Sequence, residues 1–204
     1  MKPGLSLRAG LALLALVAAS ACSTKVERID EREAVDLSGA WNDTDSRLVS
    51  EEMVRDSLSR PWIQEWGGGA GAGKKRPAVI VGEVRNLSHE HINVNTFTLD
   101  VERALINSGK VDFVATKDER KGIREERKDQ DINAREDTRS AMGKELGADF
   151  MLTGTINTIV DPSGSTQVRF YQVNMTLTSL ADNRKVWVGQ KDIRKLVTRS
   201  KLRF

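Results

Sequence analysis

Apolar and polar positions form an ordered pattern from Pro77 onward. Residues 77–84 (PAVIVGEV) are rich in β-branched side chains, which is typical of a strand buried on both faces. Residues 111–115 (VDFVA) repeat this character over a shorter run. The pattern therefore predicts a buried strand over 77–84 and a short strand over 111–115.

The C-terminal part of the chain has a different period. Three apolar runs at 149–160, 166–181 and 186–197 are separated by the turn-forming segments DPSG (161–164) and DNRK (182–185). The middle run alternates strictly, so it places one set of apolar side chains on a single face: Tyr171, Val173, Met175 and Leu177. These runs predict an antiparallel meander of three strands.

Between these regions the apolar period changes to that of a helix. A helix capped near Asn93 or Asn95 and closed by Gly109 would gather its apolar residues on one face. That face consists of Val94, Phe97, Val101, Ala104, Leu105 and Ser108. The segment 86–93 (NLSHEHIN), which precedes this helix, is predicted to be a loop.

Residues 117–139 contain 16 charged side chains, eight of each sign. Interspersed opposite charges favour an exposed helix with ion pairs between successive turns. We expect this helix to end in a loop near 129–133. A further helix is predicted over about 135–146, closed by Gly147.

Residues 37–66 form a separate helical unit. Asp43, Thr44 or Asp45 could cap a helix whose apolar stripe contains Leu48, Met53, Val54 and Leu58, and which Pro61 stops. Trp41, Trp62 and Trp66 flank this helix, and they are three of the four tryptophans in the chain. Docking of the helix on the main domain explains these aromatic residues better than a partner surface does.

The order of elements predicts an α+β fold: a mixed sheet of about five strands with a C-terminal antiparallel meander, and helices packed against it. The expected divisions are a signal peptide at 1–21, a lipidated N-terminus and tether at 22–36, a helical segment at 37–66, a Gly-rich linker at 67–76, the α+β domain at 77–197 and a tail at 198–204.

The first 22 residues read as an export signal. Lys2 and Arg8 form a basic region, Leu11 to Ala19 form an apolar one, and small residues lead to Cys22. This arrangement resembles a bacterial lipobox, which implies that Cys22 carries acyl chains. Because it is the only cysteine, no disulfide can form within the chain. Several acyl chains anchor a protein stably to a membrane. Ser23 follows where an aspartate would signal retention in the inner membrane, so we expect the outer membrane.

Charge and composition exclude several functions. Loss of Lys2 and Arg8 with the signal peptide lowers the net charge from +3 to +1. A net charge this small gives no electrostatic indication of nucleic-acid binding. Gly68, Gly73 and Lys74 nearly match a phosphate-binding loop, but Lys75 stands where Ser or Thr is required and no strand precedes it. We therefore expect neither a cofactor nor a small-molecule substrate.

Residues suited to catalysis are few. The only histidines, His89 and His91, flank Glu90 in a loop, and two imidazoles with one carboxylate make a weak metal site. Exposed loop histidines are the simpler interpretation, so no metal site is assigned. No serine or cysteine nucleophile motif is present. These observations favour a binding protein over an enzyme, although a metal-dependent enzyme using His89 and His91 stays a minor alternative.

Several stretches together resemble the LpoB family of penicillin-binding protein activators, whose fold is similar to curli-secretion and TolB-type periplasmic domains. The stretches are LSGAWNDTDSRLVSEEMV (37–54), RPAVIVGEVRNLSHEHIN (76–93), FTLDVERALINSGKVDFVA (97–115), ELGADFMLTGTINTIVD (145–161) and VNMTLTSLADNRKVWVGQ (173–190).

The resemblance implies a non-catalytic lipoprotein of the Gram-negative outer membrane that faces the periplasm. Such a protein binds a bifunctional (class A) penicillin-binding protein and stimulates its synthesis of peptidoglycan for the cell wall. From the sequence we name Arg85, Asn86, His89 and His91 as candidate partner-binding residues, since their loop joins two rigid elements. A curli-pore-like secretion or assembly lipoprotein, or a periplasmic structural binding module, is the alternative.

Overall fold

The computed structural model describes residues 26–30, 33, 35–66, 76–140, 143 and 145–199. The chain divides into two units, residues 1–34 and residues 35–204. In the first unit, the described residues belong to no helix or strand. The second unit contains every element named below. The predicted signal peptide, Cys22 and almost all of the predicted linker lie outside the described residues.

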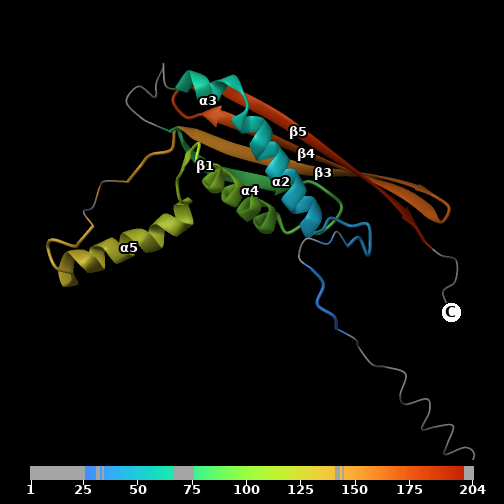
Figure 1. Ribbon diagram of the computed structural model, residues 1–204, viewed down its shortest axis with the longest axis horizontal. Coiled ribbons are helices and arrows are strands. Elements are labelled where there is room, and N and C mark those ends of the chain that lie inside the picture. Colours follow the sequence, from blue (N-terminus) through green and yellow to red (C-terminus); the bar gives the residue numbers. More distant parts are fainter. Residues whose placement is uncertain are drawn as a thin grey trace, which may run out of the picture. The chain divides into compact units, whose positions relative to one another are not determined.

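Five strands form one mixed sheet, as the sequence predicts (Figure 1). Their order across the sheet is β2-β1-β3-β4-β5. Strand β1 runs parallel to β2 and to β3, whereas β3, β4 and β5 form the antiparallel meander. The strands are β1 (Ala78–Asn86), β2 (Asp112–Phe113), β3 (Phe150–Ser163), β4 (Thr166–Ser179) and β5 (Lys185–Thr198).

The turn between β3 and β4 lies further along the chain than its sequence suggests. The strands pair as far as Ser163 opposite Thr166, so residues 161–163 belong to β3 and the predicted DPSG turn is wrong. Gly164 opens the two-residue loop with a φ of 59°, as the first residue of a type II′ turn does. The chain therefore reverses direction at Gly164, which adopts the positive φ that this type of hairpin turn requires.

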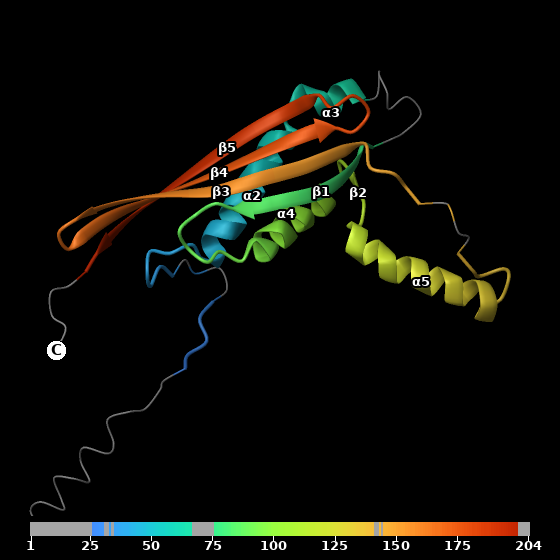
Figure 2. The same ribbon diagram turned by 180° about the vertical axis from the view of Figure 1, so that it is seen from behind.

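Two long helices, α2 (Asp43–Leu58) and α4 (Val94–Ser108), cover the same face of the sheet (Figures 1 and 2). Helix α2 is capped by Asn42 rather than by the predicted Asp43, Thr44 or Asp45. The Asn42 side chain accepts from the Asp45 amide, and the Asp45 carboxylate accepts from the Asn42 amide. Asn93 caps α4, and Gly109 ends it in the left-handed conformation, as expected.

The core lies between these helices and the sheet. Apolar residues of β3 and β4 alternate toward the helices, and the predicted set from Tyr171 to Leu177 is fully buried. Phe97, Val101 and Leu105 meet them from α4, while Val49 and Met53 do so from α2. Leu48 does not join the stripe predicted for α2. It points away from the core and leaves Val49 in its place.

The tryptophans dock the N-terminal helical unit on the sheet, in agreement with the preferred interpretation. Trp62, in the short helix α3 (Pro61–Glu65), and Trp66 after it both pack edge-on against Phe150, with ring centroids 5.1 and 5.3 Å apart. The Trp187 indole N–H donates to Asp56 across 2.8 Å. This bond lowers the pKa of Asp56 against the opposing effect of burial, so an ionised carboxylate joins α2 to β5.

The charged region folds differently from the prediction. A single helix, α5 (Lys117–Asn133), includes the residues expected to form a loop, and none of its side chains is buried. Described residues in the range predicted as a helix over 135–146 form turns and irregular chain instead. This segment contains Asp137, Thr138, Ser140 and Gly143, which have low helix propensity, and a short isolated helix is marginal in water.

Two isoleucines on neighbouring parts of β3 provide a matched test of the core. Ile156 is 0% exposed between the helices and the sheet, whereas Ile159 points to the other face and is 64% exposed. Ile156→Ala should lower the free energy of unfolding by about 3 kcal/mol through lost packing and a cavity. Ile159→Ala should lower it by less than about 0.5 kcal/mol. Urea denaturation followed by circular dichroism measures both, and equal losses would contradict the assigned faces.

Candidate partner-binding site

The loop between β1 and α4, residues 87–93, is fixed by its own polar side chains. The Asn86 side chain accepts from the Ser88 amide and donates to the Glu90 carbonyl, at 2.9 and 2.7 Å. The Ser88 hydroxyl donates to the same carbonyl. The Leu87 amide also continues the β1–β3 pairing by donating to Ile156. Asparagine and serine stabilise tight turns in this way, so the loop is rigid rather than a free connection.

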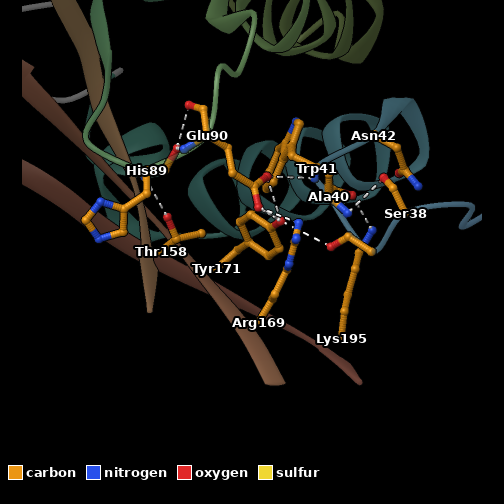
Figure 3. A network of polar contacts seen from close by, with 12 residues as sticks. Ser38, Ala40, Trp41, Asn42, His89, Glu90, Thr158, Arg169, Tyr171 and Lys195 are labelled. Atoms are coloured by element: carbon orange, nitrogen blue, oxygen red, sulfur yellow. Dashed lines mark hydrogen bonds and ion pairs between the residues drawn. The ribbon is translucent and has the colours of Figure 1, made fainter. Parts of the chain in front are cut away.

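Glu90 turns inward from this loop and forms the centre of a polar network (Figure 3). Its carboxylate accepts from the Tyr171 hydroxyl at 2.8 and 2.9 Å and from the Trp41 amide at 3.3 Å. The guanidinium of Arg169 pairs with it at 2.7 Å. One carboxylate therefore connects three parts of the chain: the loop, strand β4 and the segment before α2.

The environment of Tyr171 keeps its phenol protonated. Burial raises the pKa of Tyr171, and its hydrogen bond to the negatively charged Glu90 raises it further, whereas Arg169 lowers it by less. The hydroxyl is therefore a permanent donor to Glu90 and not a base. With its carboxylate engaged by three donor groups, Glu90 is likewise held in a structural role.

Lys195 makes a second connection at the same end of the domain. Its ammonium lies 2.6 Å from the carboxylates of both Asp36 and Asp45, and it donates to the Ala40 carbonyl at 3.1 Å. Burial lowers the pKa of Lys195, but hydrogen bonds and charge attraction from the two aspartates outweigh that effect and raise it. The charged ammonium thus holds the segment that enters α2 against β5.

The structure brings only some of the candidate residues together. Asn86 is half-buried within the turn, while His89 and His91 are exposed on its outer side. The His89 amide donates to the Thr158 hydroxyl, which ties the loop to β3. Arg85 lies apart from them, because it alternates with the buried Val84 and therefore belongs to the sheet face opposite the helices.

The His-Glu-His triplet does not form a metal-binding cluster. Glu90 points into the domain toward Tyr171, whereas His89 points away from it (Figure 3). In the described part of the chain, no group of three or more histidine, cysteine or acidic side chains could hold a metal ion.

Sequence reasoning missed the residues whose polar contacts connect the loop 87–93 and the segment before α2 to strands β4 and β5. They are Glu90, Arg169, Tyr171 as a hydrogen-bond donor, Lys195 and Asp45. One signal was available. The alternation of β4 and β5 places Arg169 and Lys195 on the sheet face that packs against the helices. A charged side chain on such an inward face requires a partner of opposite charge or a hydrogen-bond acceptor. The partner itself, Glu90, is 79 residues from Arg169 along the chain, so no local pattern reveals it.

The loop 87–93 is largely exposed, and the charged groups behind it, Glu90, Arg169 and Lys195, each have a partner of opposite charge. The sequence model described as peptidoglycan-synthase activator LpoB matches residues 45–193. The chain therefore belongs to the LpoB family of peptidoglycan-synthase activators. A search of curated proteins gives no significant match.

Solved structures with a similar arrangement include two from this family. The LpoB C-terminal domain from Salmonella enterica is 15% identical, with 74% of this chain and 99% of that chain covered and a TM-score of 0.44. That from Escherichia coli is 15% identical, with 73% and 98% covered and a TM-score of 0.43. Lipoprotein GNA1162 from Neisseria meningitidis is 15% identical, with 61% and 87% covered and a TM-score of 0.39.

The network around Glu90 predicts a measurable cost for removing one charge. Glu90→Gln keeps the shape and the acceptor for Tyr171 but leaves the half-buried Arg169 without its counter-ion. We expect the free energy of unfolding to fall by about 2 kcal/mol. Amide hydrogen exchange in the loop 87–93 should also become faster.

The control is Glu136→Gln, because the Glu136 side chain is 91% exposed and its pair with Arg139 is long, at 3.9 Å. That change should alter stability by less than about 0.5 kcal/mol. Unchanged stability and exchange in Glu90→Gln would show that the network does not hold the loop.

Proposed function

We propose that this protein is a non-catalytic lipoprotein that binds a bifunctional (class A) penicillin-binding protein and activates its synthesis of peptidoglycan. The observation that carries the proposal is the family match over residues 45–193, which includes most of α2, all of α4 and most of the sheet. The family is one of peptidoglycan-synthase activators. The engaged state of Glu90 and Tyr171 is consistent with a role in binding rather than catalysis.

The proposed attachment to the membrane is a lipid on Cys22. The N-terminal sequence supports it, because a basic region, an apolar region and small residues precede the single cysteine. No helix within the described residues has the length and apolar character needed to cross a bilayer. With Ser23 after the cysteine, the proposed location is the outer membrane, with the domain facing the periplasm. The folded contacts begin near Asp36, so about 14 residues serve as the tether, reaching roughly 50 Å when fully extended.

Activation by such a protein requires a difference in affinity. A protein without a catalytic site can stimulate a synthase only if it binds the active conformation more tightly than the inactive one. The proposed contact surface is the loop 87–93, with His89 and His91 exposed on it. Of the other two candidate partner-binding residues, Asn86 shapes the turn and Arg85 lies apart on β1. Support comes from the rigidity of this loop and from the exposure of Leu87 and both histidines, because a preordered loop loses little entropy on binding.

The function is tested by binding and by activity together. The full-length protein, purified in detergent, should retain a class A penicillin-binding protein of the same cell on a column and raise its rate of glycan polymerisation on lipid II. His89→Ala combined with His91→Ala should weaken retention if the loop is the contact, whereas Lys128→Ala on α5 should not. Absence of both retention and stimulation for every class A synthase of the cell would refute the function.

The anchor is tested separately. Cys22→Ser replaces the sulfur that would carry the acyl chains with a hydroxyl of similar size. We expect this variant to incorporate no labelled palmitate and to leave the membrane fraction, while the unchanged protein incorporates the label and sediments with outer membranes. A Ser23→Ala control should behave as the unchanged protein. Retention of Cys22→Ser in the membrane would contradict the proposed attachment.

A further inference from the structure

A second surface, distinct from the loop, lies between the two long helices. A groove of about 520 Å³ runs along α2 and α4 on the side away from the sheet. The helices are joined at one end by a hydrogen bond of 2.8 Å from the Ser46 hydroxyl to Asp100. The groove opens beyond this bond because Ser50, Ala104 and Ser108 are small, so facing side chains do not fill the space between the helix backbones.

The groove has a basic rim. Arg47 and Arg55 line it from α2, and Arg103 and Lys110 line it from α4 and the residues just after it. Only two acidic residues, Glu51 and Asp100, lie among them, and each already faces an arginine of its own helix. Within the described part of the chain, Arg55 and Lys110 form no ion pair. The rim therefore carries an excess of positive charge, with its unpaired cations at the end where α2 and α4 terminate.

The floor of the groove is partly apolar. Val54, Leu58 and Ala104 line it beside the polar side chains of Ser50, Asn107 and Ser108. A bound group could therefore place hydrocarbon against the apolar side chains and acidic groups against the rim. A membrane surface is flat and would not enter a concave groove. A peptide segment with alternating apolar and acidic side chains satisfies both the floor and the rim.

We propose that this groove binds an acidic segment of the peptidoglycan synthase, as a second contact in addition to the loop. The inference rests on the proposed function, since it names the chemistry of the partner's segment. From Arg47 to Leu58 the helix rises by roughly 16 Å. That length fits about five residues of extended chain. The acidic side chains of the segment face Arg55 and Lys110, and its apolar side chains enter toward Val54.

Charge reversal tests the inference. Arg55→Glu combined with Lys110→Glu, made in the full-length protein, should weaken binding to the class A synthase by about tenfold or more and make the remaining binding less sensitive to salt. Lys121→Glu combined with Lys128→Glu, two exposed lysines of α5, makes the same change in net charge away from the groove. This control should bind within about twofold of the unchanged protein.

Because reversed charges near helix ends can reduce stability, Arg55→Gln combined with Lys110→Gln provides a second variant. It should unfold at the same temperature as the unchanged protein and still lose affinity. A photo-crosslinking residue in place of Asn107, which also lines the groove, should become linked to a segment of the synthase that contains several acidic residues.

The outcomes separate this inference from the proposed function. If the unchanged protein binds and stimulates the synthase while both charge variants bind as tightly, the groove is not a contact and the inference fails alone. Crosslinks that map only to segments without acidic residues would also overturn it. If the unchanged protein binds no class A synthase, the proposed function fails, and the inference fails with it.

Discussion

One-sided burial of the sheet is the constraint on which the rest of the structure depends. The buried apolar side chains of β1, β3 and β4 face α2 and α4, whereas the opposite face carries several threonine, asparagine and glutamine residues together with exposed apolar ones such as Ile159. Both helices are needed to cover the apolar face, so the segment before residue 66 is part of the domain and not an appendage. The aromatic contacts of Trp62 and Trp66 with Phe150 complete that cover at one end.

At the end of the domain that contains Glu90 and Lys195, polar contacts rather than apolar packing hold the segments together. Glu90 and Lys195 each collect several partners from distant parts of the chain, and together they fasten the entry to α2 and the loop before α4 to the ends of β4 and β5. Each of these charged groups lies mostly out of water. Removal of one of them therefore leaves its partner partly buried without a counter-charge, which lowers the stability of the fold. This dependence explains why the loop that presents His89 and His91 is rigid.

A binding protein of this kind needs surfaces that are shaped before the partner arrives. The loop 87–93 and the groove between α2 and α4 meet that need in different ways. The first is ordered by a polar network behind it, and the second exists because small residues separate two helices that the core already holds in place. The loop precedes the N-terminal end of α4, and the groove runs from Asp100 toward the C-terminal ends of α2 and α4, so the two surfaces are separate. The charged helix α5, which buries nothing, contributes no comparable surface.

The sequence by itself determined the class of fold, the number of strands, the meander and the helix from Val94 to Ser108, because period, caps and turn residues act over a few positions. It also carried the family resemblance, since that depends on the order of such segments. Tertiary structure alone decided the strand order and the replacement of Leu48 by Val49 in the core, whereas the Asn42 cap and the irregular chain near 135–146 are local features that the sequence prediction missed. It also decided the partners of Glu90, Arg169 and Lys195. The physical reason is that these outcomes depend on which surfaces are available for burial and on charges that meet across 79 or 159 positions, and no local pattern contains that information.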